Sequence, residues 1–129
     1  MRPEWLLSQF STIDEVKAAL SSVRVVGLEK TAVVHWRIGE PSGRQVVLEI
    51  VGGVPHFYEN TVGVLTNAPG FEWQLTNLNN YVNLHPGDAS MQKLSGITLQ
   101  PTGGNSGFLG IPGDPTPPSR FVRAAFYRG

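Results

Sequence analysis

The two side chains whose positions best suit chemistry in this sequence are Asn67 and Arg120. Asn67 follows an apolar run, Val62–Thr66, that is typical of a β-strand, and an amide at a strand end can donate an N–H group to a ligand. An Asn before Ala-Pro is also a common turn residue, which is the plainer interpretation. Arg120 falls in the first turn of a predicted helix, Ser119–Arg128, where its charge opposes the helix dipole. An arginine there either reaches solvent or serves an anion or a thiolate.

Three histidines and a glycine-rich loop are weaker candidates. His35, His56 and His85 fall on separate predicted elements, and none has a second ligand at the spacing typical of a metal site. His35 and His56 are therefore expected to be strand residues on a half-exposed face. The loop Gly103–Gly107 is glycine-rich like a phosphate-binding loop, but it lacks the Gly-Lys-Ser/Thr ending and does not lead directly into a helix. We expect it to be flexible or to face a substrate.

Composition narrows the classes of function. The chain has 129 residues, enough for one domain with a modest core, and its ten basic and ten acidic residues cancel. This balance argues against a nucleic-acid partner bound through charge. No stretch approaches the length of a membrane span, and the N-terminus lacks the basic-then-apolar pattern of a signal peptide. The chain contains no cysteine, which excludes disulfides, thiolate metal sites and thiol nucleophiles within these 129 residues.

The elements before Asn67 are predicted to be a helix followed by an antiparallel sheet. Thr12–Glu15 has the pattern of a capping box, and apolar residues continue at helical spacing through Ile13, Val16 and Leu20. Short loops predict a meander with strands at Val23–Leu28, Ala32–Ile38, Gln45–Val51, Val54–Tyr58 and Val62–Thr66. Gly52-Gly53 suits a two-residue hairpin turn. Apolar residues on both faces of Gln45–Val51 predict a sheet that is covered on both sides.

The elements after Asn67 are predicted to be two helices joined by a long, turn-rich segment. The buried stripe of the first helix is expected at Phe71, Leu75, Leu78 and Val82, with Asn77 and Asn80 off the stripe. The segment from 85 to 118 is mostly turn-forming, with one apolar island at Ile97–Leu99. Thr116 can cap the last helix, and Pro117 suits its first position. The inward residues of that helix are expected to be Phe121, Val122, Ala125 and Phe126.

Two long motifs occur in a fixed order. The first runs Leu65-Thr66-Asn67-Ala68-Pro69-Gly70-Phe71-Glu72-Trp73-Gln74, followed by Asn77-Leu78 and Tyr81. The second runs Gly110-Ile111-Pro112-Gly113-Asp114-x-Thr116-x-x-Ser119-Arg120-Phe121. Together they resemble the choloylglycine hydrolase family, which contains penicillin V acylases and bile salt hydrolases. The preceding strands also resemble that family's central meander, so the similarity covers nearly the whole chain.

The resemblance implies a fold, a reaction and two site residues. The fold would be α+β, part of a four-layer αββα N-terminal-nucleophile hydrolase sandwich. The reaction would be hydrolysis of a linear amide by an N-terminal Cys, whose free α-amine acts as its base and which forms an acyl-thioester. By motif, Asn67 and Arg120 match the family's active-site Asn and Arg in supporting roles. An amide N–H can stabilise the tetrahedral intermediate, and a guanidinium favours the thiolate. No cofactor and no metal are implied.

The absence of cysteine is a departure from the family pattern. The family's nucleophile, its nearby Arg and Asp, and another oxyanion Asn would all lie upstream of Met1. We therefore interpret residues 1–129 as a single incomplete domain, the central segment of a longer amidase domain, and expect this chain alone to be inactive. The expected partner is a small-molecule amide, with self-association of the full-length parent and with no nucleic acid or membrane.

Two other hypotheses remain open. One is a non-catalytic binding or interaction module that kept the scaffold and lost the nucleophile. Coding sequence upstream of Met1 would discriminate between this hypothesis and the amidase. The other is an unrelated all-β domain, in which Asn67→Ala and Arg120→Ala would leave turnover of a completed enzyme unchanged. The substrate stays undecided among penicillin V, conjugated bile salts and other N-acyl amides, with Trp73 slightly favouring the penicillin acylase branch.

Overall fold

A computed structural model describes residues 10–22 and 34–128 of the chain. Its internal contacts divide the chain into two compact units, Met1–Leu65 and Thr66–Gly129, and each is described here by itself. The predicted strand Val23–Leu28 and the first two residues of the predicted strand Ala32–Ile38 lie outside the described residues. The single incomplete domain expected over residues 1–129 stays a prediction.

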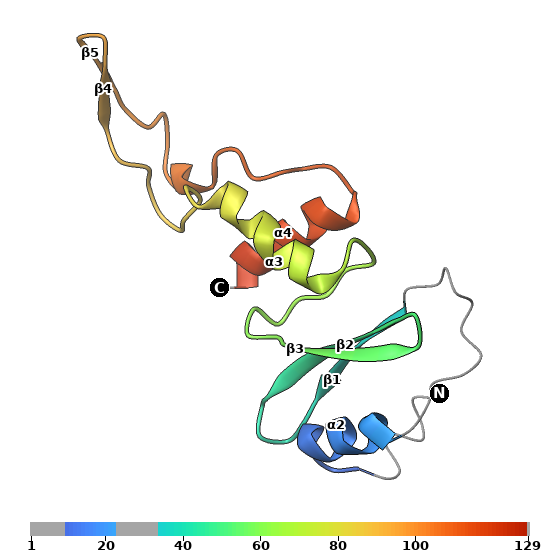
Figure 1. Ribbon diagram of the computed structural model, residues 1–129. Helices are drawn as coiled ribbons and strands as arrows, with labels where there is room; N and C mark the ends of the chain where they lie inside the picture. Colours follow the sequence, from blue (N-terminus) through green and yellow to red (C-terminus); the bar gives the residue numbers. More distant parts are fainter. Residues whose placement is uncertain (1–9, 23–33, 129) are drawn as a thin grey trace. The chain divides into compact units, whose positions relative to one another are not determined.

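The first unit contains a three-stranded antiparallel sheet with the order β1-β2-β3 (Figure 1). The strands are β1 (Val34–Gly39), β2 (Gln45–Val51) and β3 (Val54–Glu59). Val51 pairs with Val54, and the two residues between them, Gly52 and Gly53, both have positive φ angles of 58° and 81°. A two-residue turn with both central residues in this region matches the twist of the strands, so the three middle strands of the predicted meander and their hairpin are confirmed.

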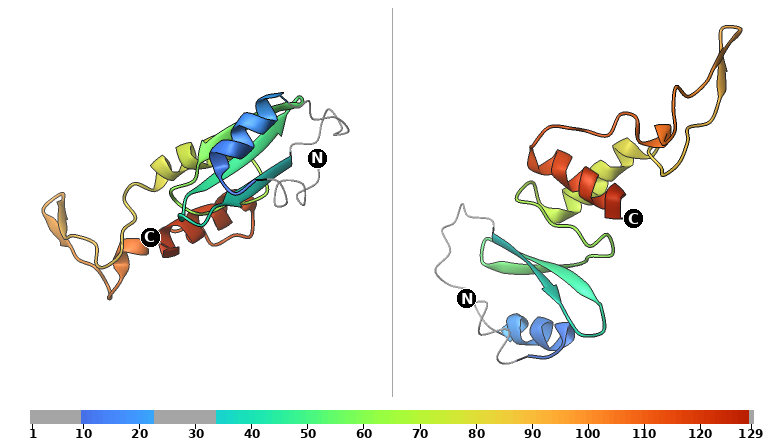
Figure 2. Two further views of the ribbon diagram at one scale, coloured as in Figure 1. Left: turned by 90° about the horizontal axis from the view of Figure 1, so that it is seen from below. Right: turned by 180° about the vertical axis from the view of Figure 1, so that it is seen from behind.

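Helix α2 (Ile13–Ser22) covers one face of this sheet (Figures 1 and 2). Their shared core consists of buried aliphatic residues, two from the helix and two from the central strand: Val16, Leu20, Leu48 and Ile50. Residues of β2 that point to the other face, Val47 and Glu49, are buried as well. The prediction of a sheet covered on both sides is therefore confirmed for β2, whereas Arg37 of β1 and His56 of β3, on that other face, are exposed.

The start of α2 is fixed by three side-chain acceptors. The Thr12 hydroxyl accepts the N–H of Glu15 at 3.3 Å, as the capping box predicts. The Glu15 carboxylate reaches back to the N–H of Ser11 at 3.2 Å, one residue earlier than a capping box requires. From the sheet side, the Glu40 carboxylate accepts the N–H of Ile13 at 3.0 Å. The first turn of the helix is therefore held both locally and by the end of β1.

Replacing Thr12 by alanine should lower the free energy of unfolding by about 1 kcal/mol, because it removes one acceptor from the first turn of α2. Thr12→Ser should recover most of this loss, since it keeps the hydroxyl. Thr61→Ala removes the same atoms from an exposed bend and should be close to neutral. The three variants are compared by urea unfolding, and equal midpoints for Thr12→Ala and Thr61→Ala would contradict the assigned cap.

The segment that precedes Asn67 is not the predicted strand. Val62–Thr66 has no strand structure, because the buried side chain of Asn60 takes backbone groups that a strand ladder would need. Its Oδ1 accepts the N–H of Gly63 at 2.9 Å, and its Nδ2 donates to the carbonyl of Val64 at 3.3 Å. Gly63 also adopts a left-handed φ of 72°. Asn67 therefore follows a side-chain-braced loop, and the strand prediction was wrong.

Two helices form the core of the second unit. They are α3 (Phe71–Leu78) and α4 (Pro117–Arg128), and they pack against each other (Figure 1). The rings of Phe71 and Phe121 meet edge to face, with centroids 6.1 Å apart, and both side chains are buried. Helix α4 begins at Pro117, as predicted, and Val122 is also buried. This contact joins the two sequence motifs.

The predicted stripe of the first of these helices is only partly right. Phe71 is buried and Leu75 and Leu78 are half-buried, but Val82 is 79% exposed. The reason is that α3 ends at Leu78 and tightens into the 3-10 helix η1 (Asn79–Tyr81), so the α-helical spacing no longer applies. Gln74, a polar residue, is buried instead, with its Nε2 3.4 Å from the Thr66 hydroxyl.

Residues 85–107 form an arm that extends away from α3 and α4 in Figures 1 and 2. The arm carries a short antiparallel hairpin, β4 (Gln92–Leu94) and β5 (Ile97–Leu99), and ends in the 3-10 helix η2 (Ser106–Phe108). Every residue of the two strands is exposed. Among the described residues, no helix combines the length and apolar character needed to cross a membrane.

The base of the arm is closed by backbone hydrogen bonds at Gly107. The N–H of His85 donates to the Gly107 carbonyl at 3.1 Å, and the N–H of Gly107 donates to the Gly87 carbonyl at 2.8 Å. The Asp88 carboxylate adds a contact to the N–H of Asn105 at 2.7 Å. Gly107 is buried, so this end of the glycine-rich loop is tightly packed and not flexible, while the alternative that the loop faces a substrate stays a prediction.

Candidate functional site

The structure brings the two predicted site residues together. Asn67 and Arg120 are 53 residues apart in sequence, and Nη2 of Arg120 donates to Oδ1 of Asn67 at 2.9 Å. Asn67 lies in the loop just before α3, and Arg120 lies in the first turn of α4. Both residues are exposed. The packing of α3 against α4 therefore holds an amide and a guanidinium in direct contact at the surface of the second unit.

This contact fixes which way the Asn67 amide faces. Arginine has only donors, so the atom of Asn67 that meets Nη2 must be the carbonyl oxygen. The Asn67 Nδ2 group consequently points its two N–H bonds elsewhere, and it has no hydrogen-bond partner among residues 10–22 and 34–128. A charged donor on Oδ1 also polarises the amide and strengthens its N–H groups as donors. Asn67 is therefore oriented to present N–H groups to a ligand.

Arg120 is held at a second point. Its Nε donates to the carbonyl of Pro115 at 3.0 Å, while its own backbone N–H donates to the carbonyl of Thr116 at 2.9 Å. Both side-chain bonds of Arg120 in the described part of the chain thus go to neutral acceptors, the Pro115 carbonyl and the Asn67 amide. The guanidinium is thus oriented, and no carboxylate of the described residues pairs with it.

Asp114 provides the negative charge that suits the start of α4. Its carboxylate accepts the N–H of Thr116 at 3.0 Å and the hydroxyl of Ser119 at 2.6 Å. The hydroxyl of Thr116, predicted to cap the helix, also donates to this carboxylate. The hydrogen bonds from Ser119 and then from Thr116 lower the pKa of Asp114 from its ordinary value of 3.8 to about 2. An anion at a helix N-terminus offsets the unfavourable position of Arg120 there.

Acid should loosen the start of α4 in a defined pH window. Because the pKa of Asp114 is lowered on folding, its ionised form stabilises the fold above pH 3.8, and this contribution is lost as the pH falls through about 2. Between pH 3.8 and about pH 2, the free energy of unfolding of the Asp114→Asn variant should therefore change less than that of the wild-type chain. Chemical unfolding of both proteins across that pH range measures this difference. The titration of the Asp114 carboxyl is followed by NMR, and a titration midpoint at pH 3.8 in the folded chain would contradict the assigned hydrogen bonds.

The other sequence candidates lie away from this pair. His35 and His56 lie in strands, as predicted, and the sheet register aligns both with Glu49 on one face. The Nδ1 of His35 is 3.9 Å from a Glu49 carboxylate oxygen. Within the described ranges, no group of three or more His, Cys, Asp or Glu residues has a geometry that could hold a metal ion. His85 lies at the base of the arm, where its Nδ1 is 2.9 Å from the Pro86 carbonyl.

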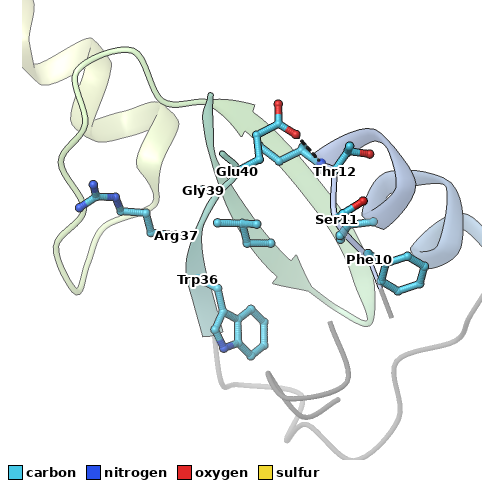
Figure 3. A pocket seen from close by; sticks show the side chains of 10 residues that line it. Phe10, Ser11, Thr12, Trp36, Arg37, Gly39 and Glu40 are labelled. Atoms are coloured by element: carbon cyan, nitrogen blue, oxygen red, sulfur yellow. Dashed lines mark hydrogen bonds between the residues drawn. The ribbon is translucent and has the colours of Figure 1, made fainter. Parts of the chain in front are cut away.

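A pocket of about 230 Å³ lies in the first unit (Figure 3). It is lined by the start of α2 and by one side of β1, with the aromatic rings of Phe10 and Trp36 facing it. Glu40, the one carboxylate among the described lining residues, accepts the N–H of Ile13. This described part of the lining contains neither Asn67 nor Arg120, and it offers no group of residues suited to acid–base or nucleophilic chemistry.

Comparison with known proteins identifies the family. A model of linear amide C-N hydrolases of the choloylglycine hydrolase family matches residues 2–129. The chain belongs to the choloylglycine hydrolase family. The resemblance inferred from the motifs around Asn67 and Arg120 is thereby confirmed.

Members of this family with curated names support the same assignment. The chain is 38% identical over 129 residues to a bile salt hydrolase/transferase of Clostridium perfringens, and 40% identical over 129 residues to a conjugated bile acid hydrolase of Lactobacillus acidophilus. These alignments cover 96% and 95% of this chain but only 39% and 40% of the relatives. The chain thus spans about two fifths of the length of the curated relatives that it matches.

A solved structure confirms the fold class. The chain superposes on the crystal structure of a single-residue variant of conjugated bile acid hydrolase from Clostridium perfringens with a TM-score of 0.78, at 38% sequence identity. The match covers 96% of this chain and 39% of that structure. The α+β fold of an N-terminal-nucleophile hydrolase, expected from the motifs, is therefore confirmed for this chain.

Sequence reasoning found the pair but missed the groups that surround it. Asp114, Ser119 and the Pro115 carbonyl were not identified as site residues, although Asp114 and Ser119 are both part of the second motif. The signal that could have found them was the Asp-x-Thr-x-x-Ser spacing before a helix, in which an acid is followed by two hydroxyl residues. Arg123, three residues beyond Arg120, carried no such signal.

Proposed function

We propose that this chain is the central segment of an amidase that cleaves a linear N-acyl bond, with Asn67 and Arg120 as its supporting catalytic residues. The observation that carries the proposal is the hydrogen bond between these two residues. The bond orients the Asn67 amide so that its N–H groups are available to a substrate. It leaves Arg120 charged and fixed beside that amide.

In the proposed reaction, Asn67 and Arg120 each stabilise a different negative charge. Attack on the amide carbonyl moves negative charge onto its oxygen, and the Asn67 N–H groups stabilise that oxyanion. The Arg120 guanidinium favours the thiolate form of the attacking cysteine, because a nearby cation lowers the pKa of a thiol. The α-amine of the N-terminal cysteine accepts the thiol proton and passes it to the amine that leaves as the C–N bond breaks, and water then hydrolyses the acyl-thioester to the free acid and the thiol. This chain has no cysteine, so we propose that it has no turnover alone.

The substrate that we propose is a glycine- or taurine-conjugated bile salt. Relatives named as bile salt hydrolases/transferases or conjugated bile acid hydrolases are 34–40% identical to this chain across nearly its whole length. Penicillin V is the second candidate, since the family also contains penicillin V acylases and Trp73, which favours that branch, is 47% exposed. The partner of the site is thus a small amide, and we propose that the longer parent self-associates.

A chimera tests this proposal. The matched segment of the Clostridium perfringens relative is replaced by residues 1–129, which leaves the relative to supply the remaining part of the fold. We expect this chimera to hydrolyse conjugated bile salts faster than penicillin V and the 129-residue chain to hydrolyse neither. A folded chimera that turns over none of these amides would overturn the proposed function. That outcome would favour a non-catalytic binding module on the same scaffold.

A further inference from the structure

The loop before α4 is attached to that helix at two points, through Arg123 and through Asp114. On one side, Nη1 of Arg123 donates to the carbonyls of Pro112 and Asp114, both at 2.7 Å. Arg120 and Arg123 lie three residues apart, so they share one face of α4. Arg123 is half-buried, and its Nη1 bonds only to backbone carbonyls of the loop among the described residues.

On the other side, the Asp114 carboxylate ties the loop to the first turn of the helix. Ser119, which donates to this carboxylate, is only 8% exposed and lies next to Arg120 in sequence. The backbone of Asp114 is thus held by Arg123, and its side chain is held by the helix. The carbonyl and the carboxylate of Asp114 are therefore each hydrogen-bonded to a side chain of α4.

Between these two attachments lies Pro115, whose carbonyl accepts the Nε–H of Arg120. The Pro115 carbonyl shares one peptide plane with the N–H of Thr116, and that N–H donates to the Asp114 carboxylate, so the carbonyl has little freedom to turn. The position of that oxygen decides the plane of the Arg120 guanidinium. The plane of the guanidinium in turn decides whether Nη2 reaches Asn67.

We propose that Asp114 and Arg123 are positioning residues that hold the Arg120 guanidinium against Asn67 through the Pro115 carbonyl, an assignment that rests on the proposed function of that pair. A carboxylate in the place of the Pro115 carbonyl would orient Arg120 equally well but would neutralise it. Two positioning residues that act through a neutral acceptor keep the charge of Arg120 available for an anion. Asp114 and Arg123 themselves need not touch the substrate.

The first test measures Arg120 directly in the 129-residue chain. Arg123→Met keeps the aliphatic stem and removes both bonds to the loop, and Arg128→Met makes the same change at the exposed end of α4. We expect solvent exchange of the Arg120 Nε–H, followed by NMR, to accelerate about tenfold in Arg123→Met and to stay unchanged in Arg128→Met, because only the first loosens the acceptor. Asp114→Asn should act in the same direction, and Arg123→Lys should restore part of the protection. Unchanged exchange in both Arg123→Met and Asp114→Asn would overturn the proposal.

The second test measures turnover in the chimera. Arg123→Met should lower kcat by about tenfold to a hundredfold while KM changes little, because a guanidinium displaced by a fraction of an ångström stabilises the reacting groups less well. Faster Nε–H exchange with unchanged kcat would overturn the positioning role. Faster exchange in the chain together with an inactive unsubstituted chimera would instead overturn the proposed function, since the exchange measurement does not depend on turnover.

Discussion

Asn67→Ala in the chimera should lower kcat for amide hydrolysis by about 10²–10³-fold, the loss typical of removing one oxyanion donor. The reason is geometric: the Arg120 bond commits Oδ1 of Asn67 and leaves Nδ2 as the group that faces a ligand. The KM should change much less than kcat, because charge on the substrate oxygen develops only in the transition state. Steady-state kinetics with a glycine-conjugated bile salt measures both constants.

A pair of controls separates the donor role from a structural one. Asn67→Asp keeps the shape and the contact with Arg120, but it offers no N–H group and places a carboxylate beside the guanidinium, so its kcat should be no higher than that of Asn67→Ala. Asn83→Ala removes an exposed Asn in a turn and should leave kcat unchanged. Full activity of Asn67→Asp would show that this position serves only to hold Arg120, and it would refute the donor role.

Gly107→Ala should destabilise the protein by about 3 kcal/mol or more, at the upper end of the cost of overpacking. A Cβ at this position would lie 2.1 Å from the His85 carbonyl oxygen and 2.8 Å from that of Gly87. Both are backbone atoms of residues that are hydrogen-bonded to Gly107, His85 through its N–H and Gly87 through its carbonyl, so they cannot move aside without disturbing the base of the arm. Thermal and urea unfolding of the chain, compared with the wild type, measure the loss.

The matched control for this change is Gly103→Ala. Gly103 lies four residues earlier, and no heavy atom lies within 4 Å of a Cβ built there. We expect this variant to unfold within about 0.5 kcal/mol of the wild type, as surface substitutions usually do. Equal stability of the two glycine variants would mean that the base of the arm is not the tight contact described above.

Local rules allowed the parts of the fold with strong periodicity to be predicted. The alternation in Gln45–Val51 and the Gly52-Gly53 turn are decided by neighbouring residues, and both were correct. The strand at Val62–Thr66 was wrong, because its apolar pattern gives no sign that a buried Asn60 side chain would take the backbone bonds. The prediction that Val82 is buried was also wrong, because the change from α-helical to 3-10 geometry before it is not visible in the apolar pattern.

The sequence predicted the two site residues, but it did not predict that they are in contact. The motifs indicated Asn67 and Arg120 separately, but no spacing rule predicts that residues 53 positions apart share a hydrogen bond. That contact depends on the edge-to-face packing of Phe71 on Phe121, which places the ends of α3 and α4 together. The role of the Pro115 carbonyl could not be predicted either, because a backbone oxygen has no signature in the sequence.

The closed base of the arm has a consequence for how this protein can vary. The arm lies between Asn67 and Arg120 in sequence, yet its two ends meet at Gly107, so residues added at its tip do not lengthen the path that joins the site residues. Even with the base open, doubling such a loop would cost only about 0.6 kcal/mol of closure entropy. The exposed tip between β4 and β5 is therefore the place in the second unit where insertions and a foreign peptide should be tolerated. Natural selection can reshape this surface while the amide–guanidinium pair stays as it is.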